Sequence, residues 1–462
     1  MERVEISKLY RKNNLYENKT NEITVCGWVR SLRCSKKIGF IDLNDGSCIS
    51  SLQVVFKDKL KNFEEISHIG VGACISVLGV LVSTPLAAQL FEFHATSISI
   101  KGASTSDYPL QKKKHSLEYM RTIAHLRART NTFSSIFRIR SSASYAIHKF
   151  LQEDDFNYIH TPIITGNDAE GAGEAFSVTS FDLKNEKLKK FDFSKDFFGK
   201  HVMLTVSGQL QAECMATALS KVYTFAPTFR AENSNTQRHA AEFWMLEPEI
   251  AFANLNDIIN LASRLIKYIV KHVLNFCEKD LEFLNKTYDE KLLIRLENIL
   301  QTDFDVITYT QAINILEDSE NNFEYEVSWG KDLQSEHERY LTEKIFKKPI
   351  FVIDYPKNIK AFYMRQNDDE KTVAAMDMLF PGIGEMIGGS QREERLDLLL
   401  KRIKELNLKK EDYWWYLELR KYGTVEHSGF GLGFERLLMF LTSFSNIRDV
   451  MPFPRTVKNA EF

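Results

Sequence analysis

Residues 222–249 read VYTFAPTFRAENSNTQRHAAEFWMLEPE. The pattern predicts a strand over 222–230, a polar loop over 233–238 and a returning strand over 242–252. By itself, an arginine at the end of a strand is usually a surface residue. Here, however, several charged groups and an aromatic ring gather around one hairpin, and that set suits a polyphosphate and a purine. Its members are Arg230, Glu232, Arg238, His239 and Phe243.

Alternating glycines lie near the C-terminus, where residues 427–436 read HSGFGLGFER. Such glycines let a backbone approach closely, and Arg436 stands at the start of an apolar helix predicted over 437–441. Anions are favoured at a helix N-terminus. A glycine-rich strand that only packs against a neighbour would not need the arginine, so we interpret this segment as a second contact to phosphate.

The usual nucleotide and hydrolase signatures are missing. The sequence contains no G-x-x-x-x-G-K-[ST], and Arg436 stands where G-x-G-x-x-G would require its last glycine. No H-E-x-x-H and no G-x-S-x-G occur. P-loop, dinucleotide-binding, metalloprotease and α/β-hydrolase functions therefore have little support.

The N-terminal part of the chain predicts a small β-barrel. Five short strand patterns are separated by turn signals, and one helical segment, 59–67, falls between the third and the fourth strand. This order is typical of an OB-fold, which commonly binds single-stranded nucleic acid; another small β-barrel is the alternative. The strands are predicted over 23–33, 38–43, 52–56, 73–83 and 91–100.

The rest of the chain predicts a larger α+β domain. Apolar residues recur at helical spacing over 131–153 and 256–277. Strand patterns separated by irregular loops favour an antiparallel sheet over a doubly wound one. Besides the hairpin, strands are predicted over 158–164, 202–206, 351–355 and 361–365, and an exposed loop over 317–326. We expect an OB-fold over 1–105, a linker over 106–130 and the α+β domain over 131–462.

A basic run crosses the linker. Between Lys112 and Arg140 the chain has eight Lys or Arg residues and a single acidic one, Glu118. Such a run is either a solvated face or a contact to phosphate. Because the formal net charge of the whole chain is only −2, any nucleic acid has to be bound by a local patch.

The composition is that of an ordinary folded chain, with 44% hydrophobic and 26% charged residues among 462. The six cysteines have neither metal-site spacing nor the pattern of a disulfide framework. The longest apolar stretch, 73–82, is far shorter than the roughly 20 residues of a membrane span. The first 14 residues lack the apolar core of a signal peptide. We therefore expect a reduced, cytoplasmic protein without a membrane segment.

Three segments carry a family resemblance: YIHTP at 158–162, the hairpin at 229–249 and GLGFER at 431–436. They resemble motifs 1, 2 and 3 of the class II aminoacyl-tRNA synthetases, and an OB-fold ahead of the catalytic domain resembles the aspartate, asparagine and lysine subgroup. Three further strings are similar to bacterial-type asparaginyl-tRNA synthetases. These strings are DAEGAGE at 168–174, LTVSGQLQAE at 204–213 and RAENSNT at 230–236.

The resemblance implies an α+β catalytic domain, an antiparallel sheet flanked by helices, in a homodimer with Pro162 at the interface. Its substrates would be ATP, L-asparagine and tRNA(Asn). Catalysis of this kind depends on positioning and charge rather than on a protein nucleophile. As catalytic residues the resemblance implies Arg230, on the α-phosphate, and Arg436, which with His239 would hold the γ-phosphate while Phe243 stacks on adenine.

The same resemblance implies a Mg²⁺ cofactor that accompanies ATP. Asp377 and Glu385 would be its protein ligands, and Mg²⁺ prefers a few such oxygens together with phosphates and water. Glu232 and Arg238 complete the implied ATP-binding set. As isolated residues, either of the two magnesium ligands would more often be a solvated surface group.

For the amino acid, the resemblance implies that Gln209 and Glu247 meet the α-ammonium and that Glu170 lies on a closing loop. Arg392 would reach the side-chain carbonyl. Since an arginine alone prefers an anion, a carboxylate has to offset it, and we predict Glu213, one helical turn after Gln209 if this stretch is helical. A solvated helix glutamate is the alternative.

In the OB-fold, the resemblance places Arg30, Phe40 and Gln53 at the anticodon, where an aromatic ring would stack on a base and polar groups would read its edge. A buried barrel phenylalanine is the alternative for Phe40. For the whole chain, the alternatives are a non-discriminating aspartyl-tRNA synthetase and a catalytically inactive RNA-binding paralogue.

Overall fold

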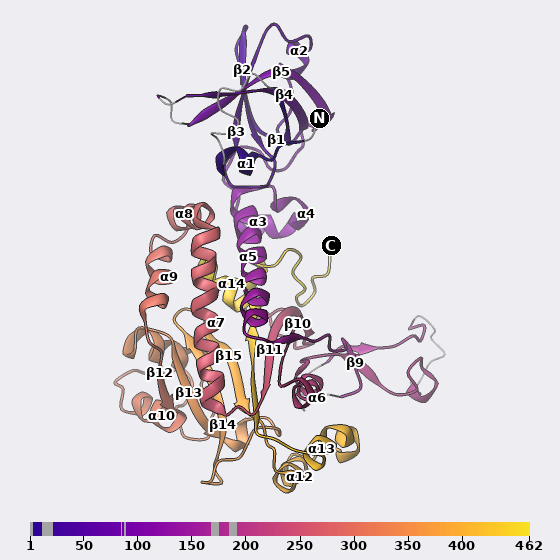
Figure 1. The fold of residues 1–462 in the computed structure, drawn as a ribbon, viewed down its shortest axis with the longest axis vertical. Coiled ribbons are helices and arrows are strands. Elements are labelled where there is room, and N and C mark those ends of the chain that lie inside the picture. Colours follow the sequence, from indigo (N-terminus) through magenta and orange to yellow (C-terminus); the bar gives the residue numbers. More distant parts are fainter. Residues whose placement is uncertain (1–2, 12–21, 85, 87–88, 168–174, 184–191) are drawn as a thin grey trace. The chain divides into compact units, whose positions relative to one another are not determined.

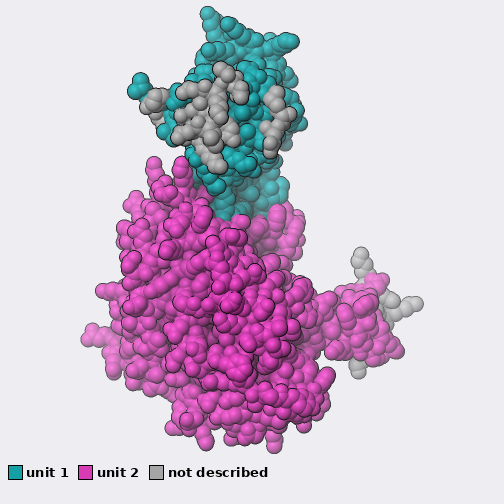
Figure 2. Space-filling view, viewed as in Figure 1, with its two compact units in different colours: residues 1–138 teal, residues 139–462 magenta. Residues whose placement is uncertain are grey.

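The computed structural model describes residues 3–11, 22–84, 86, 89–167, 175–183 and 192–462. The chain divides into two compact units, residues 1–138 and 139–462 (Figure 2). The first unit contains both the predicted OB-fold and the predicted linker, together with the first turns of the helix predicted over 131–153. Among the described residues, no helix is both long and apolar enough to cross a membrane.

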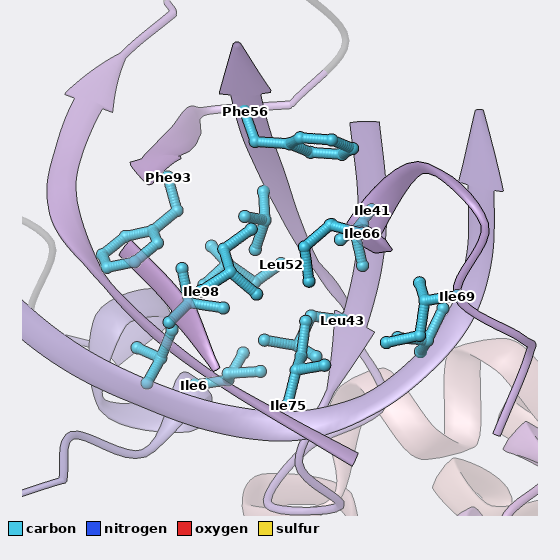
Figure 3. Close-up of a cluster of buried hydrophobic side chains, with 14 of the residues drawn as sticks. Ile6, Ile41, Leu43, Leu52, Phe56, Ile66, Ile69, Ile75, Phe93 and Ile98 are labelled. Carbon is cyan, nitrogen blue, oxygen red and sulfur yellow. The ribbon is translucent and has the colours of Figure 1, made fainter. Parts of the chain in front are cut away.

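A closed barrel with the strand order β1-β2-β3-β5-β4 forms the core of the first unit (Figure 1). Alternate side chains point inward, so that Ile41, Leu52, Ile75 and Phe93 are fully buried in the barrel (Figure 3). The predicted OB-fold is confirmed. The elements are α1 (Ile6–Arg11), β1 (Ile23–Cys34), β2 (Ile38–Asn44), β3 (Leu52–Lys57), α2 (Phe63–Ser67), β4 (Cys74–Ser83), β5 (Phe91–Gly102), α3 (Leu117–Thr122) and α4 (Ala124–Arg127).

A β-bulge interrupts the pairing of β1 with β2. Val29 opposes Leu43 and Ser31 opposes Asp42, so Arg30 is the extra residue. A bulge breaks the regular alternation of side chains and re-aims the residue that it contains. Beyond the bulge, Arg33 lies directly opposite Phe40.

The second unit is organised around an eight-stranded sheet with the order β12-β13-β14-β15-β16-β11-β10-β6. The strands from β13 to β10 pair antiparallel, and the two edge strands, β12 and β6, pair in parallel. The predicted antiparallel sheet is therefore confirmed except at its edges. Its strands are β6 (Asn157–Tyr158), β10 (Lys221–Phe229), β11 (Glu242–Ala251), β12 (Asp305–Thr308), β13 (Ile350–Pro356), β14 (Thr372–Phe380), β15 (Gly384–Gln391) and β16 (His427–Gly433).

Helices pack against this sheet and against one another. The long α7 contacts β14, β15 and β16 through an apolar face, and α6 contacts β10 and β11. The helices predicted over 131–153 and 256–277 are confirmed as α5 and α7. The helices are α5 (Asn131–Glu153), α6 (Gln209–Leu219), α7 (Leu255–Phe276), α8 (Glu278–Thr287), α9 (Leu292–Gln301), α10 (Tyr309–Glu317), α11 (Ser335–Arg339), α12 (Leu396–Glu405), α13 (Trp414–Lys421) and α14 (Phe434–Thr442).

Two strand predictions need correction. The segment 158–164 is not one strand, because β6 joins the main sheet whereas β7 (Ile164–Thr165) joins a separate sheet with β9 (Val202–Leu204) and β8 (Ser177–Val178). The exposed Pro162 lies between them and has no N–H to donate. The strand over 361–365 was wrong: the segment forms turns that bury both Phe362 and Tyr363, which a strand would point to opposite faces.

On one face of the sheet, glycines of β16 lie against side chains of β11. Side chains alternate along β11, so Met245, Glu247 and Glu249 share a face. On the neighbouring β16, a side chain at Gly429 would collide with the Glu249 carboxylate, and one at Gly431 with Met245. The alternating glycines therefore make room for these β11 side chains over the sheet.

Candidate active site

A cavity borders this face beside the hairpin of β10 and β11. Its lining combines the hairpin, the start of β15 and the first turn of α14, three segments that lie far apart in the chain. The structure thus brings together all the residues that the sequence assigned to the nucleotide. They are Arg230, Glu232, Arg238, His239, Phe243, Glu385 and Arg436.

Three arginines and a histidine line this cavity together with three glutamates. The guanidinium carbon of Arg230 lies 5.6 Å from the centre of the Phe243 ring, and Arg436 lies in the first turn of α14, 3.7 Å from a Glu385 oxygen. Burial lowers the pKa of His239, and the nearby Arg436 and Arg230 lower it further. Polyphosphate would relieve this repulsion and accept the charged hydrogen bonds.

Two carboxylates stand beside the cavity. Asp377 on β14 is buried, and one of its oxygens lies 2.7 Å from Lys360 Nζ. The second carboxylate is that of Glu385. The other Asp377 oxygen and one Glu385 oxygen both lie near Gly388. A Cβ on this glycine would lie 3.4 Å from Asp377 Oδ1 and 2.7 Å from Glu385 Oε1. Glycine at this position therefore makes room for both carboxylate oxygens. Within the described part of the chain, no group of three or more His, Cys, Asp or Glu side chains is arranged to hold a metal.

A third carboxylate, that of Glu338 on α11, lies behind these two. It accepts a hydrogen bond from the Glu385 backbone N–H at 3.3 Å. Burial, together with the charges of Glu385 and Asp377, raises the pKa of Glu338 to about 7. Gly384, with φ of +81°, makes room for this carboxylate, because a Cβ there would lie 2.3 Å from a Glu338 oxygen.

The predicted ammonium-binding residues meet at the N-terminus of α6. The Glu247 carboxylate is buried and accepts hydrogen bonds from Ser207 Oγ and from the Gly208 backbone N–H, the latter at 3.0 Å. Burial raises the pKa of Glu247. Gln209 Nε2 donates to Glu213 Oε1 at 3.1 Å, which confirms that these two residues share one face of the helix.

Arg392 is paired with a carboxylate that sequence analysis did not assign. Its Nη2 and Nε donate to the two oxygens of Glu249 at 2.5 and 3.2 Å, and its Nη1 donates to Ser390 Oγ at 2.7 Å. Burial opposes the charge of Arg392, but Glu249 raises its pKa. The carboxylate in contact with Arg392 is therefore Glu249, whereas the prediction had offered Glu213.

Glu213 has other partners. One of its oxygens accepts from Arg420 Nη2 at 2.9 Å, and both accept from Tyr416 Oη. His427 Nε2 lies 2.8 Å away. Although burial opposes ionisation, Arg420 and His427 lower the pKa of Glu213. The glutamate is fully buried, so it is not a solvated helix residue.

The sequence left several residues of this region unassigned. Glu249 could have been found from its alternation with Glu247 in the same strand, because both must face the site. The partners on α13 follow no local pattern, since only the packing of that helix brings them near α6. The unassigned residues are Ser207, Glu249, Ser390, Tyr416, Arg420 and His427. Glu170 lies outside the described residues.

The first unit places two of the three predicted anticodon residues together. Phe40 and Gln53 line one cavity with Arg33. Phe40 is half-buried between the inward-facing Gly39 and Ile41, so it is not a core phenylalanine. Arg30 lines a different cavity of this unit, whereas Arg33 lines the cavity of Phe40 and Gln53.

Comparison with known proteins agrees with this geometry. The family of class II tRNA synthetases (D, K and N) matches residues 116–457, and the OB-fold nucleic acid binding domain matches residues 23–100. The asparagine–tRNA ligase of Clostridium beijerinckii is 61% identical over 460 residues, and that of Acetivibrio thermocellus is 62% identical over 461, each match covering 99% of both chains.

Solved structures are similar as well. The asparaginyl-tRNA synthetase of Pyrococcus horikoshii, complexed with asparaginyl-adenylate, superposes with a TM-score of 0.87 at 34% identity, covering 99% of this chain and 98% of that one. The asparaginyl-tRNA synthetase of Entamoeba histolytica, also in complex with asparaginyl-adenylate, gives 0.82 at 27% identity, covering 96% and 97%. The chain belongs to the class II tRNA synthetases of the D, K and N group.

Proposed function

We propose that the chain is an asparagine–tRNA ligase. It activates L-asparagine with ATP, forming asparaginyl-adenylate and releasing pyrophosphate, and then transfers the asparaginyl group to the 3′-terminal ribose of tRNA(Asn), releasing AMP. The observation that carries the proposal is the cavity in which Arg230, Phe243 and Arg436 converge beside the buried Arg392–Glu249 pair. Relatives with this name match the chain along nearly its full length.

The residues of the cavity explain the first step by positioning and charge. The asparagine α-carboxylate attacks the α-phosphorus, and the bond to pyrophosphate breaks, so no protein nucleophile is required. Arg230 neutralises the charge that develops at the α-phosphate, while Arg436 and His239 hold the γ-phosphate. Phe243 offers a face for adenine, and Glu232 and Arg238 complete the nucleotide site.

Magnesium fits between Asp377 and Glu385. One oxygen of each carboxylate lies within 3.4 Å of the Cβ position of Gly388, and Mg²⁺ prefers oxygen ligands. Two protein ligands leave further positions for phosphates and water. Such an ion would neutralise phosphate charge during activation.

The amino-acid end of the pocket pairs opposite charges. Gln209 and Glu247 are proposed to hold the α-ammonium, together with Glu170. Arg392 donates toward the side-chain carbonyl. Because Glu249 already neutralises Arg392, an amide is accepted without a second negative charge, which aspartate would bring.

For the tRNA, we propose that Arg33, Phe40 and Gln53 receive the anticodon, since they share one outward-facing cavity of the barrel. We further propose a homodimer with Pro162 at its interface. Exposed apolar side chains near this proline, Tyr158, Ile163 and Ile164, support that placement. We expect the enzyme to act in the cytoplasm.

Exchange of radioactive pyrophosphate into ATP tests the function directly. Asparagine should support exchange, aspartate should not, and tRNA(Asn) should be charged with asparagine. Arg230→Ala should lose about 3 kcal/mol of transition-state stabilisation or more, the scale of one preorganised charge donor. Equal exchange with aspartate would indicate a non-discriminating aspartyl enzyme, and no exchange with either amino acid would indicate an RNA-binding protein.

A further inference from the structure

A second cavity of the first unit, of about 540 Å³, is lined by β1, β2 and the segment that follows the barrel. We call it the Arg30 cavity. Of the lining residues that the structure describes, Arg30, Lys112, Lys113 and Arg129 carry full positive charges and Asp42 alone is acidic. The cavity belongs to neither the nucleotide site nor the cavity that contains Phe40.

Arg30 is held in this cavity by the bulge of β1, with little to compensate its charge. Among the described residues, its buried Nε has no hydrogen-bond partner, and its Nη2 donates to Asn44 Oδ1 at 3.4 Å. In the part of the chain that the structure describes, no carboxylate forms an ion pair with Arg30. Burial lowers the pKa of the guanidinium, whereas Tyr108 and Asp42 raise it. A half-buried guanidinium in this state has a hydrogen-bond donor left for an anion from outside.

The surroundings of Arg30 are cationic as well. The guanidinium of Arg129 lies between two rings, 5.7 Å from the centre of Trp28 and 5.8 Å from that of Tyr108. The rings fix its position without neutralising it. Lys112 and Lys113 are exposed at the rim. Burial raises the pKa of Asp42 while the charge of Arg30 lowers it, so this one carboxylate faces several cations.

We propose that the Arg30 cavity binds a backbone phosphodiester of the tRNA, a contact that rests on the proposed function. β1 and β2 supply residues both to this cavity and to the one around Phe40, so a single RNA can reach the two. Phosphate contacts position an RNA without reading its sequence. Arg30 would therefore contact the RNA backbone, whereas Arg33, which lines the cavity of Phe40 and Gln53, would contact the anticodon.

The test measures the affinity of the full-length chain for tRNA(Asn) as a function of salt. Each phosphate contact contributes about 0.7–0.9 to the slope of log K against log salt concentration, so Arg30→Gln should reduce the slope by that amount. Arg30→Gln should weaken the affinity by the same factor for a tRNA(Asn) whose anticodon has been changed. Arg30→Lys should restore most of the slope. Arg11→Gln, an exposed arginine that lines neither cavity, is the matched control.

Three results would overturn the proposal. A loss seen only with the natural anticodon would make Arg30 a base-reading residue. An unchanged slope would mean that no phosphate is bound there. Calorimetric binding of inorganic phosphate that depends on Arg30, with tRNA affinity unchanged, would identify a small-anion site instead.

Folding and the proposed function are checked separately. If Arg30→Gln lowers the thermal midpoint, the double variant Lys112→Gln/Lys113→Gln replaces it, because both lysines are exposed and should reduce the slope without unfolding the barrel. Charging of tRNA(Asn) by the unmodified chain tests the proposed function. If charging succeeds and neither the Arg30 variant nor the lysine variant changes the slope, only the phosphate contact is refuted.

Discussion

Glu249→Gln removes the negative charge that balances Arg392 while keeping nearly the same shape. In the structure the two side chains form two hydrogen bonds, at 2.5 and 3.2 Å, and both are buried. The amide can still accept one bond from the guanidinium. Arg392 would then carry an unbalanced positive charge in the pocket that we propose for the substrate side chain, and aspartate would supply the missing anion.

The size of the effect follows from Coulomb's law. At an effective dielectric constant of 20, two unit charges about 4 Å apart interact by about 4 kcal/mol. Glu249 exerts this repulsion on a substrate carboxylate, and rearrangement of the pocket and entry of water would reduce it. If only a third of this repulsion remains in the pocket, about 1.4 kcal/mol, its loss in Glu249→Gln still lowers the preference for asparagine over aspartate tenfold. We therefore expect a decrease of ten- to a hundredfold in the ratio of the two kcat/KM values.

Pyrophosphate exchange with each amino acid measures this ratio. Because loss of one partner from a buried pair costs about 3–5 kcal/mol of stability, assays should be run well below the thermal midpoint of the variant. Asp289→Asn disturbs the Asp289–Arg295 pair, which lines no part of the nucleotide cavity, and should leave the ratio unchanged. A ratio for Glu249→Gln within twofold of the original would refute the reasoning.

Three further predictions use other parts of the molecule. Glu213→Gln should lower the free energy of unfolding, measured by denaturant titration, by about 3–5 kcal/mol, because Arg420 and His427 lose their shared carboxylate. If the ratio of kcat/KM for asparagine to that for aspartate also fell tenfold, Glu213 would have the discriminating role. Phe40→Ala should raise the KM for tRNA(Asn) by about 5- to 150-fold, the loss of one stacked base worth about 1–3 kcal/mol, whereas Lys59→Gln should not change it. Removal of Mg²⁺ by EDTA should abolish exchange, and Glu385→Gln should raise the Mg²⁺ concentration that restores half of the activity; exchange that persists without Mg²⁺ would contradict the metal assignment.

Local patterns in the sequence determined the strands of the barrel, two long helices and much of the nucleotide site. Every strand of the barrel was predicted to within a residue or two, because alternation and turn residues act over short distances. The helix over 131–153 was predicted for the same reason. Arg230, Phe243 and Arg436 could be grouped because their segments carry distinctive local strings, and the structure places them around one cavity.

Tertiary structure decided which charges meet. The Glu249–Arg392 pair joins β11 to the end of β15, and Glu213 meets Arg420 only because α13 packs near α6. Such contacts depend on strand order and helix packing, which leave no short-range periodicity in the chain. Arg30 shows the limit of alternation itself: one extra residue in β1 redirects its side chain away from the cavity of Phe40, and the shift is visible only in the pairing with β2.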